Sequence, residues 1–272
     1  MQQHILRKVQ LTQLEIAREI RRVCDENDIP YFLCDGTLLG AVRHGGFIPW
    51  DDDMDLGMLR KDYQRFCRIA PEKLGAEYVL QTWDTDPNYA LPFAKIRKRG
   101  TLYLEAKSTR LQENGFFVDV FPFDYVPEEK EARLRLASRL LGIFRVKLMK
   151  SGYTPWMEND RIIWKKRLGY LYYQMKALLT SGEKLTAEFD ALATEIGKTG
   201  CLCEQSALPK PDYYEADWCE ELTDLIFEGE TFKAPKHYDA YLTALYGDYM
   251  QLPPEDQREN RHQIVELDFG EE

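Results

Sequence analysis

Four aspartates occupy the five consecutive positions of the segment Asp51–Asp55. Carboxylates this close repel one another unless a cation lies among them. Apolar residues alternate with the last two aspartates, which predicts a strand, and side chains two positions apart on a strand point to the same face. Asp53 and Asp55 would therefore share a face, where their oxygens suit a hard cation such as Mg²⁺ or Mn²⁺ that takes further ligands from water and phosphates. The pattern leaves open whether Asp51 and Asp52 are also ligands.

Two other interpretations of this acidic segment were weighed. A solvated acidic turn would explain the charge alone, although the flanking apolar residues favour a strand. A calcium loop of the EF-hand kind, counted from Asp51, needs glycine at its sixth position and glutamate at its twelfth. Leu56 and Asp62 stand at those positions, which excludes such a loop.

A single aspartate, Asp119, interrupts the apolar run Phe117–Phe121. A carboxylate inside an apolar strand is costly to bury unless it meets a cation or a hydrogen-bond donor. A metal face already lined by Asp53 and Asp55 would supply that partner, so we predict Asp119 as the third metal ligand. The alternative is a carboxylate that caps a nearby turn.

Candidate phosphate-binding groups precede the aspartates. Gly36 and Thr37 stand between an apolar run and an expected helix, where glycine lets the backbone approach a phosphate and the helix N-terminus supplies donors. The threonine hydroxyl could donate to that phosphate, although the pair could equally form a plain helix cap. Arg43 and His44 follow as candidate substrate contacts; a histidine in a polar loop is otherwise a surface residue.

Two basic residues, Lys95 and Arg97, alternate with apolar residues in the segment 92–98 and would share one strand face. Two fixed cations beside a carboxylate–metal site are suited to clamp a diphosphate. The alternative is an edge strand that its charges protect from pairing with another chain.

The elements that position these groups follow from hydrophobic periodicity. Helices are predicted at 11–27, 37–42 and 61–70, the last ending at Pro71. Strands are predicted at 31–34, 53–58, 78–82, 93–98 and 116–121. Further helices are predicted at 128–150, 160–180 and 183–197, then a strand-like run at 224–232 and a helix at 235–246 that Gly247 ends. We expect an α/β or α+β core in a single domain, residues 1–272, with a basic helical segment at about 128–198.

Charge is distributed unevenly along the chain. The net charge is −10 over 272 residues, yet residues 130–180 contain twelve Lys and Arg against three acidic residues, a local charge of +9. An acidic protein with one basic stretch is not a general nucleic-acid binder. No run of about 18 apolar residues is present, and the N-terminus lacks the apolar core of a secretory signal, so we expect a cytoplasmic protein.

Six cysteines are expected to be reduced thiols. Cys201 and Cys203 form a C-x-C pair that could bind zinc, although no second arm of ligands accompanies it. The alternative is a pair of half-buried thiols on a strand.

The basic segment contains two apolar stripes at helical spacing. The first comprises Leu134, Leu136, Leu140, Leu141, Ile143, Phe144 and Leu148, and the second Ile162, Ile163, Trp164, Leu168, Tyr172 and Met175. These stripes would ordinarily form the core of a helical subdomain. The alternative is contact with an anionic bilayer, which basic amphipathic helices favour.

The segment Gly36–Asp55 resembles the signature of the LicD family of bacterial phosphocholine transferases, which is similar also to the fukutin-related ribitol-phosphate transferases. Residues 227–250 resemble the C-terminal motif of the same family, and Leu252-Pro253-Pro254 and His262 follow. The resemblance extends from about residue 31 to 262, nearly the whole chain. His262 is on this basis a candidate substrate contact.

The resemblance implies an α+β nucleotidyltransferase fold with a mixed sheet and a helical insert or C-terminal half. In that fold a glycine pair opens a helix, a D-x-D pair follows on the next strand and a third Asp stands on a later strand. Gly36-Thr37, Asp53 with Asp55, and Asp119 fill these places, with Thr37 in place of the commoner Ser or Gly.

The implied reaction is the transfer of phosphocholine from CDP-choline to a hydroxyl of a cell-surface glycan precursor, teichoic acid or lipopolysaccharide, with release of CMP. Magnesium would neutralise the diphosphate, and Asp119 would take the acceptor's proton. The acceptor would be lipid-linked, which places the enzyme at the inner face of the membrane. The head group is not fixed: Trp83, Tyr89, Tyr103, Trp156 and Tyr172 are available to bind a quaternary ammonium, but no choline box stands out.

Three other functions remain as alternatives. Another phospho-alditol could be transferred from a CDP donor. A sugar-nucleotide glycosyltransferase also uses a D-x-D, but residue 53 leaves little room for a nucleotide-binding core before it. A non-catalytic scaffold would predict a broken carboxylate set, whereas Asp53, Asp55 and Asp119 are all present.

Overall fold

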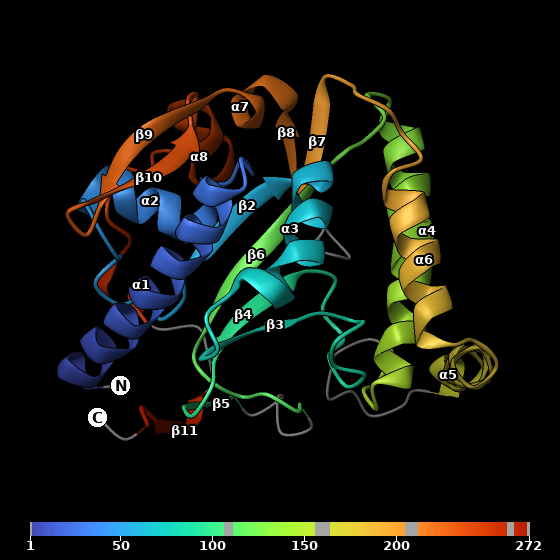
Figure 1. Cartoon of the computed structure of the whole chain (residues 1–272). Helices are drawn as coiled ribbons and strands as arrows, with labels where there is room; N and C mark the ends of the chain where they lie inside the picture. Colours follow the sequence, from blue (N-terminus) through green and yellow to red (C-terminus); the bar gives the residue numbers. More distant parts are fainter. Residues whose placement is uncertain (1, 106–110, 156–163, 205–211, 260–263, 271–272) are drawn as a thin grey trace.

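The computed structural model describes residues 2–105, 111–155, 164–204, 212–259 and 264–270. They form a mixed α+β fold, as predicted, in which helices surround a central sheet (Figure 1). The strands of that sheet are β1 (Phe32–Leu33), β2 (Asp55–Leu59), β3 (Tyr78–Gln81), β4 (Ala94–Lys98), β6 (Phe117–Tyr125), β7 (Cys201–Glu204) and β8 (Tyr213–Glu215).

The order β1-β2-β6-β4-β3 places the longest strand, β6, at the centre of the sheet. β2 and β6 are parallel, whereas the other pairs of this sheet are antiparallel. β7 pairs with the far end of β6 and continues the sheet to β8. Asp55 and Asp119 are register partners in the parallel pair of β2 and β6, so these two predicted metal ligands occupy neighbouring positions on adjacent strands.

Two helices, α1 (Gln3–Glu26) and α3 (Arg60–Lys73), cover one face of the sheet. Asp124 of β6 reaches Arg60 on α3, and Lys98 of β4 reaches Glu15 on α1. Asp119 has the opposite parity from Asp124 on β6, so its carboxylate lies on the other face. The functional face is therefore the one that α1 and α3 leave uncovered.

Helix α3 continues two residues beyond Pro71, where the sequence predicted its end. Proline removes a single backbone donor, and the amide of Leu74 still bonds to the Ala70 carbonyl. Proline in the last turn therefore does not stop this helix.

The run predicted as one strand at 224–232 is a hairpin of β9 (Leu222–Phe227) and β10 (Glu230–Pro235). Its turn residues, Glu228 and Gly229, both adopt positive φ, which tightens the chain into a two-residue reversal. A separate antiparallel pair of strands, which the sequence did not indicate, consists of β5 (Leu102–Glu105) and β11 (Ile264–Asp268).

Three shorter helices pack against the sheet or against the β9–β10 hairpin. They are α2 (Asp35–His44), α7 (Ala216–Glu220) and α8 (Tyr238–Tyr246), followed by a short 3₁₀ turn at Glu255–Gln257. Gly247 ends α8 with φ +66°, as predicted. Cys201 and Cys203 lie on a strand, also as predicted, while the zinc alternative remains a prediction.

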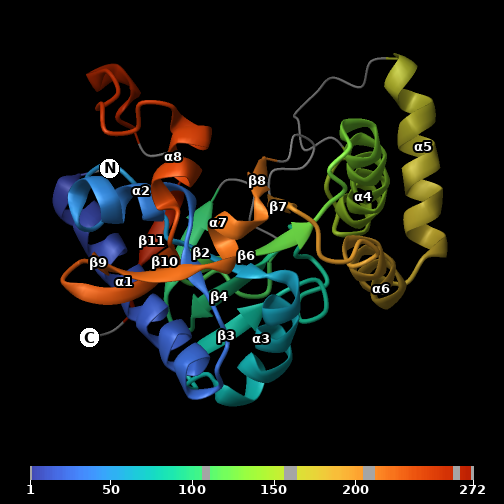
Figure 2. The same cartoon turned by 90° about the horizontal axis from the view of Figure 1, so that it is seen from above.

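The helical segment consists of α4 (Lys130–Lys150), α5 (Trp164–Leu179) and α6 (Gly182–Ala193), grouped on one side of the sheet (Figure 2). Residues 160–163 of the helix predicted at 160–180 lie outside the described residues. The predicted α4 stripe is core at Leu136, Leu140, Ile143, Phe144 and Leu148, although Leu134 is exposed. The prediction that the second stripe is core is wrong for Leu168, Tyr172 and Met175, which are more than half exposed. No helix in the described ranges combines the length and apolar character needed to cross a bilayer.

Candidate active site

The four clustered aspartates and Asp119 meet where β2 begins. Asp51, Asp52 and Asp53 each offer an oxygen within 4.8 Å of the other two, a spacing that would allow one cation to bridge them. Asp55 follows on the first residue of β2, beside Asp119 on β6. The oxygens at ligand spacing therefore belong to Asp51, Asp52 and Asp53, and the predicted ligands Asp55 and Asp119 lie close to them on β2 and β6.

The electrostatics of this site favour a cation. The pKa of Asp55 is raised well above its ordinary value, first by burial and then by the charges of Asp53, Asp119, Asp35 and Asp51. Such mutual repulsion costs free energy that a divalent cation would offset. The residues present thus fit a hard metal ion such as Mg²⁺ in ligand chemistry and charge.

A cleft of about 890 Å³ opens beside these carboxylates. One wall comes from α2 and the acidic loop and includes Asp35, Gly36, Asp51, Asp53 and Asp55. The opposite wall comes from the end of α8 and the following segment: Tyr246, Asp248, Tyr249, Gln251, Leu252, Pro253, Pro254, Gln257, Arg258 and Glu259. Segments some two hundred residues apart in the chain therefore form one substrate-sized space.

Gly36 and Thr37 support the carboxylates. A Cβ atom on Gly36 would lie 2.9 Å from Oδ2 of Asp51, so any larger residue would require that carboxylate to shift. The Thr37 hydroxyl, which is buried, accepts a hydrogen bond of 2.8 Å from the backbone N–H of Asp55. Gly36 lines the cleft, and its predicted phosphate contact stays a prediction, whereas the observed contact of Thr37 is with the start of β2.

The two basic residues of β4 differ in role. Lys95 Nζ lies 2.5 Å from Oδ1 of Asp119 and 3.4 Å from the centre of the Phe117 ring, so it belongs to the carboxylate cluster. Arg97 is 1% exposed and donates to Oε1 of Gln81 and the carbonyl of Gly115. The structure thus brings Lys95, and not Arg97, to the acidic site.

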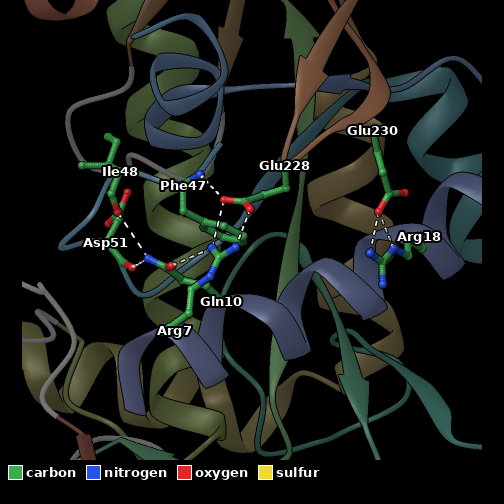
Figure 3. A network of polar contacts seen from close by, with 8 residues as sticks. All are labelled: Arg7, Gln10, Arg18, Phe47, Ile48, Asp51, Glu228 and Glu230. Atoms are coloured by element: carbon green, nitrogen blue, oxygen red, sulfur yellow. Dashed lines mark hydrogen bonds and ion pairs between the residues drawn. The ribbon is translucent and has the colours of Figure 1, made fainter. Parts of the chain in front are cut away.

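Helix α1 holds the backbone of the acidic loop (Figure 3). The Gln10 side chain donates to the carbonyls of Ile48 and Asp51, at 3.3 and 2.9 Å. The Gln13 side chain donates to the carbonyl of Asp52 at 2.7 Å and is fully buried. Sequence reasoning missed these two residues, although a glutamine within an apolar helix face is the signal that marks a buried partner.

Asp52 has a different environment from its neighbours. Its side chain is fully buried and accepts a 3.0 Å hydrogen bond from the Tyr103 hydroxyl, whereas Asp51 and Asp53 line the cleft. We infer that Asp52 anchors the loop while Asp51 and Asp53 face the substrate. The contact with Tyr103 therefore distinguishes Asp52 from Asp51, two residues whose role as metal ligands the sequence left open.

Two arginines stand on the cleft wall. Nη1 of Arg43 donates to the Tyr249 carbonyl at 2.7 Å, and Nε donates to Nε2 of His44 at 2.9 Å. The guanidinium of Arg258 lies 5.5 Å from the ring centre of Trp50. Burial, opposed in part by Tyr246 and assisted by the charge of Arg258, lowers the pKa of Arg43. No acidic side chain of the described residues forms an ion pair with either arginine, so both charges remain available to an anion.

His44 is held beside these arginines. Burial and the charge of Arg43 lower its pKa, which favours the neutral imidazole that accepts the Arg43 hydrogen bond. Its ring packs edge-on to Trp50 at 6.2 Å. His262 lies outside the described residues.

Asp35, which lines the cleft, forms a carboxyl pair with the buried Glu204. Asp35 hydrogen-bonds to Glu204 on β7 and accepts a 3.2 Å bond from the Tyr241 hydroxyl on α8. Burial raises the pKa of both carboxyl groups, so the pair is suited to share one proton. Asp35 adopts φ +47°, which directs the chain from β1 into α2.

Comparisons with known proteins agree with this geometry. Residues 28–139 match the family model described as LicD/FKTN/FKRP, nucleotidyltransferase domain. The chain is 32% identical over 263 residues to the lipopolysaccharide cholinephosphotransferase LicD of Haemophilus influenzae, an alignment that covers 94% of this chain and 96% of that protein. The chain belongs to the LicD family. It is accordingly a transferase, as predicted.

More distant relatives of this LicD-family chain match shorter segments. The mouse ribitol 5-phosphate transferase FKRP is 48% identical over 48 residues, 18% of this chain and 10% of that protein. An uncharacterised protein of Rickettsia typhi is 40% identical over 68 residues, 25% of this chain and 22% of that protein. These matches support the family assignment without extending over the whole chain.

Four of the aromatic residues singled out from the sequence, Trp83, Tyr89, Tyr103 and Tyr172, do not line the cleft of this LicD-family protein. Trp83, Tyr89 and Tyr103 are buried in packing, Tyr172 lies on α5, and Trp156 is outside the described residues. Trp50, Tyr246 and Tyr249 line the cleft instead. Sequence reasoning also missed Arg258, because its position on the cleft wall depends on how the C-terminal segment folds back.

Proposed function

We propose that this LicD-family transferase moves phosphocholine from CDP-choline to a hydroxyl group of a cell-surface glycan precursor, lipopolysaccharide or teichoic acid, and releases CMP. The observation that carries the proposal is the cleft, in which Asp51, Asp53 and Asp55 share one cavity with Arg43 and Arg258. Such a cavity can take a metal and an anionic diphosphate together. The Haemophilus influenzae relative is a lipopolysaccharide cholinephosphotransferase, and we take the proposed head group and one proposed acceptor from it.

Asp51, Asp53, Asp55 and Asp119 would hold Mg²⁺ or Mn²⁺, because Asp51 and Asp53 offer oxygens at ligand spacing and the charges of Asp51, Asp53 and Asp119 add to burial in raising the pKa of Asp55. When bound, the ion would neutralise diphosphate charge and stabilise the leaving group. Lys95 would keep Asp119 oriented through their ion pair.

The bond changes follow from the chemistry of a CDP donor. The acceptor hydroxyl oxygen forms a bond to the phosphorus of phosphocholine, and the bond from that phosphorus to the oxygen of CMP breaks. CMP leaves with the electron pair, and Asp119 takes the hydroxyl proton. Arg43 and Arg258 would bind the diphosphate oxygens, as neither forms an ion pair with an acidic side chain of the described residues.

The second candidate is transfer of another phospho-alditol from a CDP donor, which the segment shared with mouse FKRP favours. A sugar-nucleotide glycosyltransferase, weighed from the sequence, is disfavoured because residues 28–139 match a nucleotidyltransferase domain.

The proposal treats residues 1–272 as one functional unit, because the cleft takes its walls from both halves of the chain. We further propose that the acceptor is lipid-linked and that the enzyme acts on the cytoplasmic side of the membrane. No role for nucleic acid is proposed, because the net charge of −10 disfavours it.

A donor panel tests the function. The purified protein is incubated with Mg²⁺ and CDP-choline, CDP-ribitol, CDP-glycerol or two UDP-sugars, with candidate glycan acceptors, and nucleotide release is measured by mass spectrometry. CMP from CDP-choline that Asp53→Ala abolishes would support the proposal. CMP from a different CDP donor alone would replace the head group, and UDP release would overturn the reaction class.

A further inference from the structure

Helix α5 presents an unusual apolar surface to solvent. Six large apolar residues on it are between 53% and 81% exposed: Leu168, Leu171, Tyr172, Met175, Leu178 and Leu179. Their spacing repeats every three or four residues, so they lie on one side of the helix. At about 100° per residue they span an arc of about 120°. They are called the α5 stripe below.

The opposite side of α5 attaches the helix to the protein. Ala177 is buried against the second hydrophobic cluster, and Tyr173 packs on its edge. Arg145 of α4 reaches the Tyr173 hydroxyl at 3.5 Å, and Lys150 reaches the Ala177 carbonyl at the same distance. The face of α5 opposite the α5 stripe therefore makes the core contacts of the helix, and the stripe remains exposed to solvent.

Basic residues border the α5 stripe. Arg167 lies just beyond one edge of the apolar arc, and Lys176 lies beyond the other with its Nζ 5.4 Å from the Tyr172 ring. Residues 130–180 carry a net charge of +9 in a chain whose net charge is −10. An apolar stripe between cationic edges is the pattern of a helix that lies in an anionic lipid interface.

Charge also argues against a second copy of this chain as the occupant. Two α5 stripes placed face to face would bring the cationic edges of one copy against the cationic edges of the other. Like charges at an interface are unfavourable, whereas acidic lipid headgroups are complementary to both edges at once.

We propose that α5 docks on an anionic lipid surface, with the α5 stripe at the level of the headgroup–acyl boundary and Arg167 and Lys176 among the headgroups. The choice of surface rests on charge and exposure. The purpose of the contact, access to a lipid-linked acceptor, rests on the proposed function. α5 lies at the opposite end of the molecule from α2 and α8, which line the cleft (Figures 1 and 2). Changes to the stripe should therefore leave the cleft chemistry intact.

Vesicle flotation of the full chain tests the proposal. We expect the protein to float with vesicles containing phosphatidylglycerol and to bind phosphatidylcholine vesicles at least about tenfold more weakly. The triple variant Leu168→Ser/Leu178→Ser/Leu179→Ser and the charge variant Arg167→Glu/Lys176→Glu should each lose at least about tenfold in binding to the anionic vesicles. The matched control Ile226→Ser removes an exposed apolar residue from β9 and should bind like the unaltered chain.

Two further measurements separate the possible outcomes. CMP release with a soluble acceptor should be unchanged in the stripe variants. The vesicle assay uses no donor, so its result does not depend on whether the proposed donor and head group are correct. Light scattering reports oligomeric state: a dimer that the triple variant converts to monomer, with vesicle binding unaltered, would overturn the proposal in favour of self-association. Unaltered vesicle binding by both variants, or no binding by the unaltered chain, would also overturn it.

Discussion

The sheet region and the helical segment bury different kinds of residue. The sheet region encloses charged groups in specific contacts, among them Asp52 with Tyr103 and Asp119 with Lys95. The helical segment packs mainly apolar side chains inside, with Lys147 as an exception, and leaves other cations and the α5 stripe exposed. Buried charge costs free energy unless it is paired, so its concentration beside the cleft indicates where the molecule performs chemistry. Exposed apolar surface indicates instead where it meets another surface.

Removing a cleft carboxylate should have the largest effect. Asp53→Asn and Asp119→Asn keep the side-chain shape but remove a negative charge from the metal site. We expect each to reduce turnover by about 10²-fold or more while circular dichroism stays unchanged. Asp224→Asn is the matched control, since Asp224 forms an exposed ion pair with Lys233 on the β9–β10 hairpin. Equal losses in all three variants would mean that the sheet region does not concentrate the chemistry.

Removing an arginine should distinguish the two regions by anion binding. Arg258→Ala should weaken the binding of CDP or inorganic pyrophosphate, in the presence of Mg²⁺, by about tenfold in calorimetry. Arg139→Ala removes an exposed arginine of α4, which pairs with Glu195, and should leave this affinity unchanged. Equal affinity in Arg258→Ala and the unaltered protein would remove Arg258 from the diphosphate site.

Metal and pH should act together on stability. The pKa of Asp55 is raised in the folded protein, so without metal its stabilising contribution is present at low pH and is lost as pH rises through that raised value. A bound cation favours the ionised form and offsets the loss. We expect Mg²⁺ to raise the unfolding midpoint by about 3–6 °C at pH 8, and by less at pH 5. Removal of Mg²⁺ with a chelator should reverse the rise in the unfolding midpoint. An equal rise with Mg²⁺ in Asp53→Asn would contradict the prediction.

A buried lysine gives the smallest predicted effect, in the helical segment. Burial lowers the pKa of Lys147 to about 8, so the folded protein loses this proton before the unfolded chain does. Stability should therefore rise between about pH 8 and the ordinary lysine pKa of about 10.4. Lys147→Met should stabilise the protein by about 1 kcal/mol at pH 7, with a gain that shrinks towards pH 10. Chemical denaturation across this pH range measures both changes.

Local patterns predicted much of the site. Period-two alternation located the strands of Asp55 and Asp119, because alternation depends only on neighbouring residues. The same reasoning paired Lys95 with Arg97 on one face but could not foresee that Gln81 and Gly115 bury the arginine. Contacts between distant segments are not encoded in local periodicity.

The residues that support the site were therefore the ones missed. Gln13, Tyr103 and Arg258 contact the acidic loop or the cleft wall from positions at least 39 residues away in the chain. The β9–β10 hairpin was predicted as one strand, because its turn contains a non-glycine residue at positive φ. Glu228 accepts that conformation while its carboxylate bonds to Arg7 and to the amide of Phe47.

The Glu228 contacts have a consequence for biosynthesis. Every aspartate of the metal site has been translated by residue 119, yet Arg7 and the 45–48 turn meet Glu228 only after more than a hundred further residues have left the ribosome. The opposite cleft wall emerges later still, at residues 246–259. A nascent chain therefore carries the acidic residues without a finished pocket around them, and catalytic competence should begin only after residues 246–259 have been synthesised and have folded back.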